Sequence, residues 1–487
     1  MMKTKLTYLI IAIFAISSCS DDFIDVDPPF ESSETFFNSE EDYQNALIGA
    51  YDLLQTTYIN VMLGDIASNN TLSGGESATD VIGIQEIDEM IHTPINQQLR
   101  DIFGWMFAGV NRANFVLEFQ DKTDFEGKEN VIAQARFLRA YYYFELVKFF
   151  GDVPLAVDKR ISFGEQFGLE RTPRAEIYAQ MEEDLIFAAA NMPYDQTDVG
   201  RATKGSAQAL LGKVYLFQDK FQEAATVLED LINNGPYQLL SDYSTMFEND
   251  NENNIESVFE VQYTDEEGAG FGCLQCSEGN IAVGFNGIRN YNGPLFDSGF
   301  SFNVPTQETY DAFEDGDMRR DIAVLDINSW AEDTGATYDT GYKHTGYFNR
   351  KYIARQGDAN TGDANLTNPN NYRAIRYADV LLMAAEALNR GGISDGQAQM
   401  YLNMVRERAF GNSDNNITAT GIGLTNAIYR ERRVELVGEG HHFFDLVRTG
   451  RAAADIPGFQ SGKHELFPIP QIEIELAGNT WEQNPGY

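Results

Sequence analysis

Long amphipathic helices constrain the fold of this chain more than any other feature of its sequence. Apolar residues recur at helical spacing over about residues 39–58, 97–120, 127–150 and 173–191. Such periodicity, sustained over ten or more residues, predicts amphipathic helix. The fourth helix is predicted to open with Thr172-Pro173, with Thr172 as N-cap and the proline at the first helical position. Helix is therefore the predicted dominant element, and the fold class is mainly α.

A repeat-like spacing indicates how the helices pack. Within residues 201–236, the positions on the spacing of a tetratricopeptide repeat are Leu211-Gly212-x-x-Tyr215, Ala224, Leu228 and Pro236, with Leu in place of the usual Phe. Segments 128–154 and 372–411 carry looser versions of this pattern. Because such helix pairs bury their apolar faces only against neighbours, we predict a stacked helix-turn-helix scaffold over about residues 35–240 and 370–487.

The segment from about residue 240 to 370 has a different character. It is rich in Gly, Asn, Asp and Tyr, and its only regular stretches are brief strand-like pieces at Ser257–Tyr263 and Tyr347–Ile353. A second irregular stretch covers Gly64–Thr93. Loops held at both ends by a rigid frame commonly carry binding residues. We therefore expect a loop-rich, few-stranded insertion that forms the ligand-binding segment.

The N-terminus has the pattern of an export signal. Lys3 and Lys5 precede an apolar run over Leu6–Ile16, which is too short to span a bilayer, and Ser17-Ser18-Cys19 follows. We predict that residues 1–18 are removed and that Cys19 becomes a lipidated N-terminus, the alternative being an ordinary signal peptide with an incidental cysteine. Several acyl chains on one residue anchor a protein stably. The proline-bearing residues 19–34 would form the tether.

Charge and cysteine content limit the partners. The formal net charge is −39, which opposes binding to nucleic acid or to an anionic lipid surface, so we exclude nucleic acid as a partner.

Beyond Cys19, the only cysteines are Cys273 and Cys276, in GFGCLQC. In an exported protein this spacing favours a local disulfide over half of a zinc site, which would need two more ligands.

Five sequence blocks carry a resemblance to a known family. In chain order they are AQARFLRAYYYFELVKFFGDVPL (133–155), RATKGSAQALLGKVYL (201–216), RYADVLLMAAEALN (376–389), ERRVELVGEGHHFFDLVRTGR (431–451) and the ending LFPIPQIEI with QNPGY. Together they resemble the SusD/RagB family of outer-membrane lipoproteins, over essentially the whole of residues 35–487.

The resemblance implies a function and a location. Members of this family bind nutrients, usually glycans, at the cell surface and form a lid over a SusC-like TonB-dependent transporter barrel. They do not catalyse a reaction and need no cofactor. Ser20-Asp21-Asp22, directly after Cys19, also resembles the acidic surface-export signal of such lipoproteins. The implied location is the outer membrane, with the protein facing outward on its lipid anchor.

The ligand-binding residues are predicted from sugar chemistry. Sugars present apolar C–H faces ringed by hydroxyl groups, so a binder needs exposed rings for stacking and polar groups for the rim. Residues 265–350 supply both. The predicted contacts are Trp330 first, then Tyr338 and Tyr342, with Tyr291, Phe271, Asn290 and Arg289; Asn69 and Asp80 would add polar contacts from the first irregular stretch.

One feature weakens the glycan interpretation. No aromatic residue occurs from Ile59 through Ile102, the loop that lends a ring in glycan-binding relatives. A peptide or another non-sugar nutrient is therefore the alternative ligand. Trp105, inside a helical block, is predicted to be a core residue, and Trp481 is predicted to be structural.

Catalytic and metal-binding interpretations have little support. His441-His442 lies near Glu435 and Glu439, but without an HExxH motif we predict no metal there. Asp358-Ala-Asn360-Thr-Gly362-Asp363 resembles a calcium loop, yet Pro369 stands where the bidentate Glu belongs. No P-loop is present in the sequence. A surface glycosidase, which needs only a carboxylate pair, is the third hypothesis.

Overall fold

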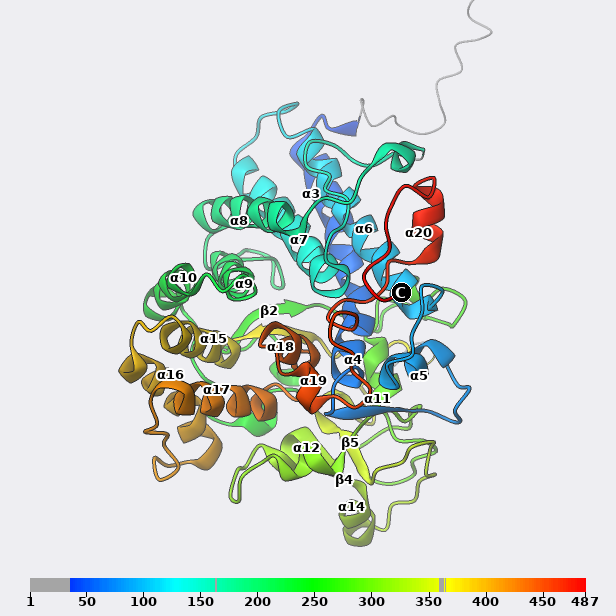
Figure 1. Ribbon diagram of the computed structural model, residues 1–487, viewed down its shortest axis with the longest axis vertical. Coiled ribbons are helices and arrows are strands. Elements are labelled where there is room, and N and C mark those ends of the chain that lie inside the picture. Colours follow the sequence, from blue (N-terminus) through cyan, green and yellow to red (C-terminus); the bar gives the residue numbers. More distant parts are fainter. Residues whose placement is uncertain (1–35, 163, 359–362, 364) are drawn as a thin grey trace, which may run out of the picture.

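The computed structural model describes residues 36–162, 164–358, 363 and 365–487. Helices dominate this part of the chain, and strands are few and short (Figure 1). The predicted mainly α fold is thus confirmed. Cys19 and the predicted tether lie outside the described residues, as do Asn360 and Gly362 of the calcium-like loop. No helix in the described part is long and apolar enough to cross a membrane.

An array of helices forms the upper and left parts of the molecule in Figure 1. Its members are α3 (Glu40–Asp52), α6 (Gln97–Glu118), α7 (Lys128–Phe150), α8 (Arg174–Asn191), α9 (Lys204–Leu216), α10 (Phe221–Asn234), α15 (Tyr377–Arg390), α16 (Asp395–Phe410) and α17 (Gly421–Glu435). From α6 to α10, each helix packs on the next, and α10 then packs on α15. The array therefore continues across the loop-rich segment that separates α10 from α15 in sequence.

The α9–α10 pair is the repeat that the sequence predicts. Gly212 faces Leu228, and a Cβ on Gly212 would lie 2.4 Å from the Leu228 Cδ2 atom. Only glycine permits this approach of the two helices without displacement of the leucine. The spacing rule thus identified a real packing contact.

Two helix boundaries differ from the sequence-based expectation. The first predicted helix is interrupted, since α3 ends at Asp52, a 3-10 turn covers Leu53–Thr57, and α4 covers Tyr58–Ile66. Thr172 does not cap α8. Instead the cap position is Pro173, and the Asp152 Oδ1 atom accepts the hydrogen bond of the Arg174 N–H at 2.8 Å. A side chain from the preceding loop thus replaces the local cap.

The strands pair antiparallel in twos. The pairs are β1 (Thr71–Gly74) with β3 (Phe302–Pro305), β2 (Ser257–Val261) with β6 (Tyr372–Arg376), and β4 (Val324–Asp326) with β5 (Tyr347–Asn349). The β2–β6 pair joins the two ends of the loop-rich segment at the helical array. Only the first part of the predicted Tyr347–Ile353 strand forms, because a 3-10 turn follows at Arg350.

Short helices fill the rest. They are α5 (Ile82–Asp88), α11 (Ile281–Asn286), α12 (Gln307–Asp311), α13 (Arg320–Ala323), α14 (Ile327–Thr334), α18 (His442–Arg448), α19 (Ala452–Asp455) and α20 (Gln471–Leu476). In Figure 1, α12 and α14 lie with β4 and β5 at the lower end, below the array.

A buried network of charges centred on Arg376 connects the array to the loop-rich segment. The Arg376 guanidinium donates to Glu256 Oε1 and Glu435 Oε1, each at 2.8 Å, and to Glu439 Oε2 at 2.9 Å. All four side chains are buried. Burial opposes ionisation of Glu435, but the surrounding cations, Arg408 foremost, hold its pKa well below its usual range.

Three more cations complete this network. Arg408 of α16 donates to Glu256 at 2.7 Å, Lys351 donates to Glu439 at 2.6 Å, and Arg319 donates to Glu435 at 2.8 Å. Lys351 and Arg319 belong to the loop-rich segment, whereas Glu435 ends α17. Breaking one partner of a buried ion pair leaves the other charge uncompensated in a medium of low dielectric.

The helix α4 contacts the chain before α18 through two glycines. A Cβ on Gly64 would lie 2.2 Å from the Gly440 carbonyl oxygen, and Gly440 has a φ of +80°. Next to this contact, the buried Asp65 carboxylate accepts a hydrogen bond from the Gly440 N–H at 3.2 Å. Burial raises the pKa of Asp65 to about 7.

Replacing Arg376 with Ala should destabilise the fold strongly. The change leaves Glu256, Glu435 and Glu439 without their shared cation, for which a loss of about 3–5 kcal/mol is expected. Urea unfolding followed by circular dichroism measures it. Lys159→Ala, which removes a solvent-exposed partner of Glu165, is the control and should leave the midpoint unchanged. Equal midpoints for both variants would contradict the structural role of the network.

Replacing Asp65 with Asn should change how stability depends on pH. The folded pKa of about 7 lies above the unfolded value of about 3.9, so the folded wild type holds an extra proton between the two. Wild-type stability relative to Asp65→Asn should therefore fall as pH rises through this window, by up to about 1.4 kcal/mol per pH unit. Urea midpoints from pH 4.5 to 8 measure the difference, and a pH-independent difference would refute the assignment.

Candidate ligand-binding surface

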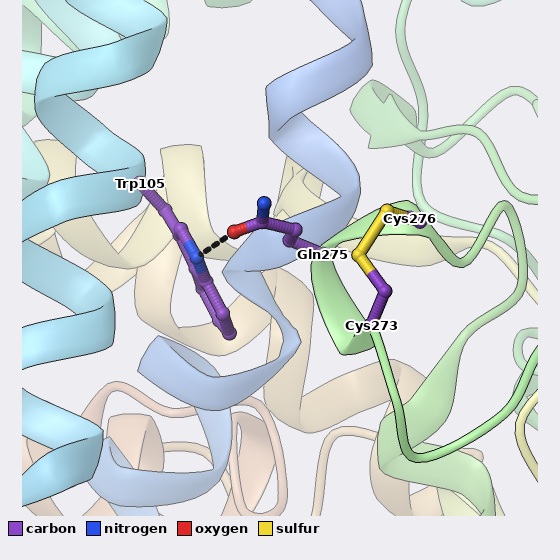
Figure 2. Close-up of a disulfide and its surroundings, with 4 residues drawn as sticks. All are labelled: Trp105, Cys273, Gln275 and Cys276. Carbon is purple, nitrogen blue, oxygen red and sulfur yellow. Dashed lines mark hydrogen bonds between the residues drawn. A yellow bond between two sulfur atoms is a disulfide. The ribbon is translucent and has the colours of Figure 1, made fainter.

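Trp105 of α6 is half-buried. Its ring packs against the buried Tyr58 at 6.4 Å, and its indole N–H donates to Gln275 Oε1 at 2.6 Å (Figure 2). The core prediction for this residue is therefore wrong in part. The apolar stripe of α6 buries Phe103 and Met106, which leaves Trp105 on the half-exposed side of the helix.

A carboxylate accompanies this ring. Asp101 precedes Trp105 by one helical turn, so both side chains lie on one side of α6. Gln97 Nε2 donates to Asp101 Oδ1 at 2.6 Å. Burial raises the pKa of Asp101. Asp101 thus offers a hydrogen-bonding group on the same side of α6 as the Trp105 ring, as sugar recognition requires.

The segment 264–278 forms the loop opposite Trp105. The Thr264 N–H donates to the Glu278 carbonyl oxygen at 2.9 Å and closes the base of the loop. Within it, Cys273 and Cys276 form a disulfide that brackets Gln275, as Figure 2 shows. Phe271 is 62% exposed near the tip, where its ring contacts Phe300 at 5.8 Å.

These rings belong to one continuous aromatic cluster. Ring contacts lead from Trp105 through the buried Tyr58 and Phe285 to Phe300 and Phe271. Tyr58 and Phe285 are core residues, whereas the other three retain exposed area. We call Trp105, Phe271 and Phe300 the ring platform.

Polar groups border the ring platform. Arg289 donates to the Phe300 carbonyl oxygen at 3.0 Å, and its guanidinium lies 3.8 Å from Asp80 and 3.9 Å from Glu76. The Arg289 Nε–H is buried and has no hydrogen-bond partner among the described residues. Two predicted contacts, Arg289 and Asp80, thus come together from segments far apart in the sequence.

Further predicted residues lie beside Arg289. The exposed Asn290 donates to Asp339 at 2.6 Å, and the Asp339 N–H donates to the Arg289 carbonyl oxygen at 2.9 Å. The Tyr342 N–H donates to the Gly75 carbonyl oxygen at 2.8 Å. We call Arg289, Asp80, Asn290 and Tyr342 the polar rim.

Trp330 and two other predicted residues lie in a separate hydrophobic cluster. The Trp330 ring packs on Phe296 at 5.2 Å, and its N–H donates to the Tyr291 hydroxyl at 2.8 Å. Tyr291 is buried and donates to the Pro294 carbonyl oxygen, and Tyr338 donates to Asn328 at 2.9 Å. Trp330 and Tyr338 are partly buried against this cluster, and the polar groups of all three aromatic residues are hydrogen-bonded within this region.

Asn69 lies apart from the polar rim. Its side chain donates to Glu308 of α12 at 2.9 Å and contacts His442 of α18 at 3.1 Å. Burial lowers the pKa of both His441 and His442 to about 3, which keeps them neutral. Among the described residues, no group of three or more His, Cys, Asp or Glu side chains is placed to hold a metal ion.

A groove of about 390 Å³ opens on the α3 side, next to the loop that carries the disulfide. Gln55, in the 3-10 turn after α3, donates to Glu278 at 2.8 Å, which links this groove to the base of the loop. Tyr51 and Arg201 line its wall. The guanidinium covers the Tyr51 ring at 5.1 Å, so this ring is not free for stacking on that face.

Sequence reasoning missed three members of the surface. The helical block favours a core position for Trp105, although its place outside the apolar stripe of α6 indicates partial exposure. The signal for Gln275 was its position between two cysteines that are predicted to pair, because such a disulfide closes a tight turn. Phe300 had no distinguishing signal, because its role depends on contacts with Phe271 and Arg289.

Two family models match this chain, one in its first half and one in its second half. A model described as "SusD family" matches residues 255–463, and one described as "Starch-binding associating with outer membrane" matches residues 22–216. Among characterised sequences, the SusD-like protein P2 of Formosa agariphila is 28% identical over the full length of both chains.

Solved structures show the same similarity. A laminarin-binding SusD-like protein is 36% identical, with a TM-score of 0.84, and the match covers 93% of this chain and 100% of that one. The surface glycan-binding protein A of Bacteroides thetaiotaomicron, solved with laminarihexaose, is 29% identical, with a TM-score of 0.81; the match covers 91% of this chain and 99% of that one.

Truncating a ring inside the core should destabilise the fold far more than truncating a ring outside it. Phe285→Ala removes a buried ring, so a loss of about 3–5 kcal/mol is expected. Phe271→Ala removes an exposed ring and should change stability by less than about 0.5 kcal/mol. Urea unfolding of both variants provides the measurement. A large loss for Phe271→Ala would place that ring in the core and remove it from the ring platform.

Proposed function

Because the chain belongs to the SusD family, we propose that it captures a glycan on the ring platform and delivers it to a SusC-like TonB-dependent transporter. The observation that carries this proposal is the juxtaposition of three partly exposed rings with the polar rim. Rings stack on the apolar faces of sugars, and the rim offers donors and acceptors to the hydroxyl groups.

The ligand class we propose is a β-glucan of the laminarin type. The support is the similarity to a laminarin-binding protein at 36% identity and to a protein solved with laminarihexaose. The segment before α6 has no aromatic residue, but Trp105 of α6 supplies a ring for stacking. A glycan ligand is therefore favoured over a peptide.

The proposed location is the outer surface of the outer membrane. The family description "associating with outer membrane" supports a location at that membrane, and the signal pattern that ends at Cys19 supports attachment by a lipid anchor. Incorporation of labelled palmitate into the full-length protein, and its loss in Cys19→Ala, would test the anchor. Copurification of the lipidated protein with a TonB-dependent transporter from outer membranes would test the partner.

The binding site is tested by two tryptophan variants. Residues 20–487 should bind laminarihexaose in isothermal titration calorimetry, and Trp105→Ala should weaken the affinity at least about tenfold, or about 1.4 kcal/mol, through loss of stacking. Trp330→Ala, in the separate cluster, is the matched control and should retain affinity.

Two outcomes would count against the proposal. Loss of affinity in Trp330→Ala with retention in Trp105→Ala would move the site to the cluster around Trp330. Shortening of laminarihexaose during incubation, detected by chromatography, would favour the glycosidase hypothesis instead of capture.

A further inference from the structure

We propose that Gln275 is a positioning residue for Trp105 and that the Cys273–Cys276 disulfide is the clamp that holds Gln275 in place. The proposal rests on the proposed function of the ring platform. It begins from the hydrogen bond between the Trp105 indole and Gln275 Oε1, which joins α6 to a loop that lies 170 residues later in the chain.

The hydrogen bond to Gln275 is the polar constraint on the orientation of the Trp105 ring, which also packs against the main core. The α6 backbone fixes its Cα atom, and Tyr58 covers one part of the ring at a tilt of 39°. The indole N–H is the one polar atom of the side chain, and Gln275 accepts its hydrogen bond. Without this acceptor the ring gains freedom about its side-chain torsions, and ligand binding must then restrict that freedom.

The loop that carries Gln275 is weakly held by packing. Phe271 and Gln275 are exposed, and a Cβ built on Gly270 or Gly272 meets no atom within 4 Å. Leu274 packs on the main core, and Ser277 donates to the Leu366 carbonyl oxygen at 2.6 Å. The loop is thus fixed at its base, whereas its outer part depends on the disulfide.

The disulfide lies around Gln275 and can therefore restrain this residue locally. It joins residues three apart and therefore closes a very short ring of chain. Stabilisation of the whole fold by a disulfide grows with the length of the closed loop, so this one contributes less than a long-range bridge. It fixes the 3-10 turn Leu274–Cys276, which presents Gln275 to the indole (Figure 2).

The same clamp controls a second ring of the platform. Phe271 lies two residues before Cys273, and the Cys273 N–H donates to the Gly270 carbonyl oxygen at 3.3 Å. Fixing Cys273 therefore also restrains Phe271 over Phe300. One covalent bond thus sets the spacing between Trp105 and Phe271, which makes it a determinant of the sugar geometry that the ring platform accepts.

The first test observes Trp105 directly and needs no ligand. The chain contains three tryptophans, so ¹⁵N-tryptophan labelling of residues 20–487 gives three indole N–H signals, and Trp105→Phe assigns the relevant one. Gln275→Leu should shift this signal and accelerate its hydrogen exchange at least about tenfold, because the acceptor is lost. Gln275→Glu, which keeps an acceptor oxygen, should restore the slow exchange.

The double substitution Cys273→Ser with Cys276→Ser should reproduce the effect of Gln275→Leu on the indole signal while thermal unfolding stays cooperative. Treatment of the wild type with dithiothreitol provides a second route to the open turn, since the dithiol is oxidised to its cyclic disulfide as the two protein cysteines become thiols. An unchanged Trp105 signal in both preparations would overturn the clamp.

The second test measures function. Gln275→Leu and the double serine variant should weaken laminarihexaose binding about three- to tenfold, and Gln275→Glu should bind within about twofold of the wild type. Weakened binding by Gln275→Glu equal to that of Gln275→Leu would refute positioning through the hydrogen bond. If the wild type binds no glycan, the proposed function fails, whereas the indole signals still decide the role of the clamp.

Discussion

The buried ion network around Arg376 fastens the loop-rich segment to the helical array. Its carboxylates come from α17, from the chain between α17 and α18 and from the chain before β2, and its cations include Lys351 and Arg319 of the loop-rich segment. Strand pairs this short stabilise little by themselves. The network therefore fixes the loop-rich segment to Glu435, the last residue of α17.

The ligand-binding surface follows from this fixed base. Helix α6 contributes Trp105 from the array, whereas Phe271, Phe300 and Arg289 come from the insertion, and Asp80 from the stretch before α5. A binding site assembled from distant segments needs a frame that holds them at constant separation. The array and its ion network supply that frame, while local devices such as the Cys273–Cys276 bridge shape individual contacts.

The sequence predicted the helical array better than the residues of the candidate ligand-binding surface. Helical periodicity and the repeat spacing identified α6 to α10, because burial of one helix face leaves a regular trace. The family blocks identified the family, and the predicted contacts Arg289 and Asp80 lie 3.8 Å apart in the structure. Ring exposure was not predictable in the same way, since Trp330 and Trp105 are both half-buried and pack against different clusters. That choice is made by tertiary contacts far apart in sequence.

The central claim is that a glycan binds across Trp105 and Phe271. A crystal structure of residues 20–487 grown with laminarihexaose tests it most directly. We predict sugar rings stacked on Trp105 and Phe271, with hydroxyl groups hydrogen-bonded to Arg289 or Asp80. Sugar density elsewhere, such as in the groove beside Tyr51 or around Trp330, with the ring platform empty, would contradict it.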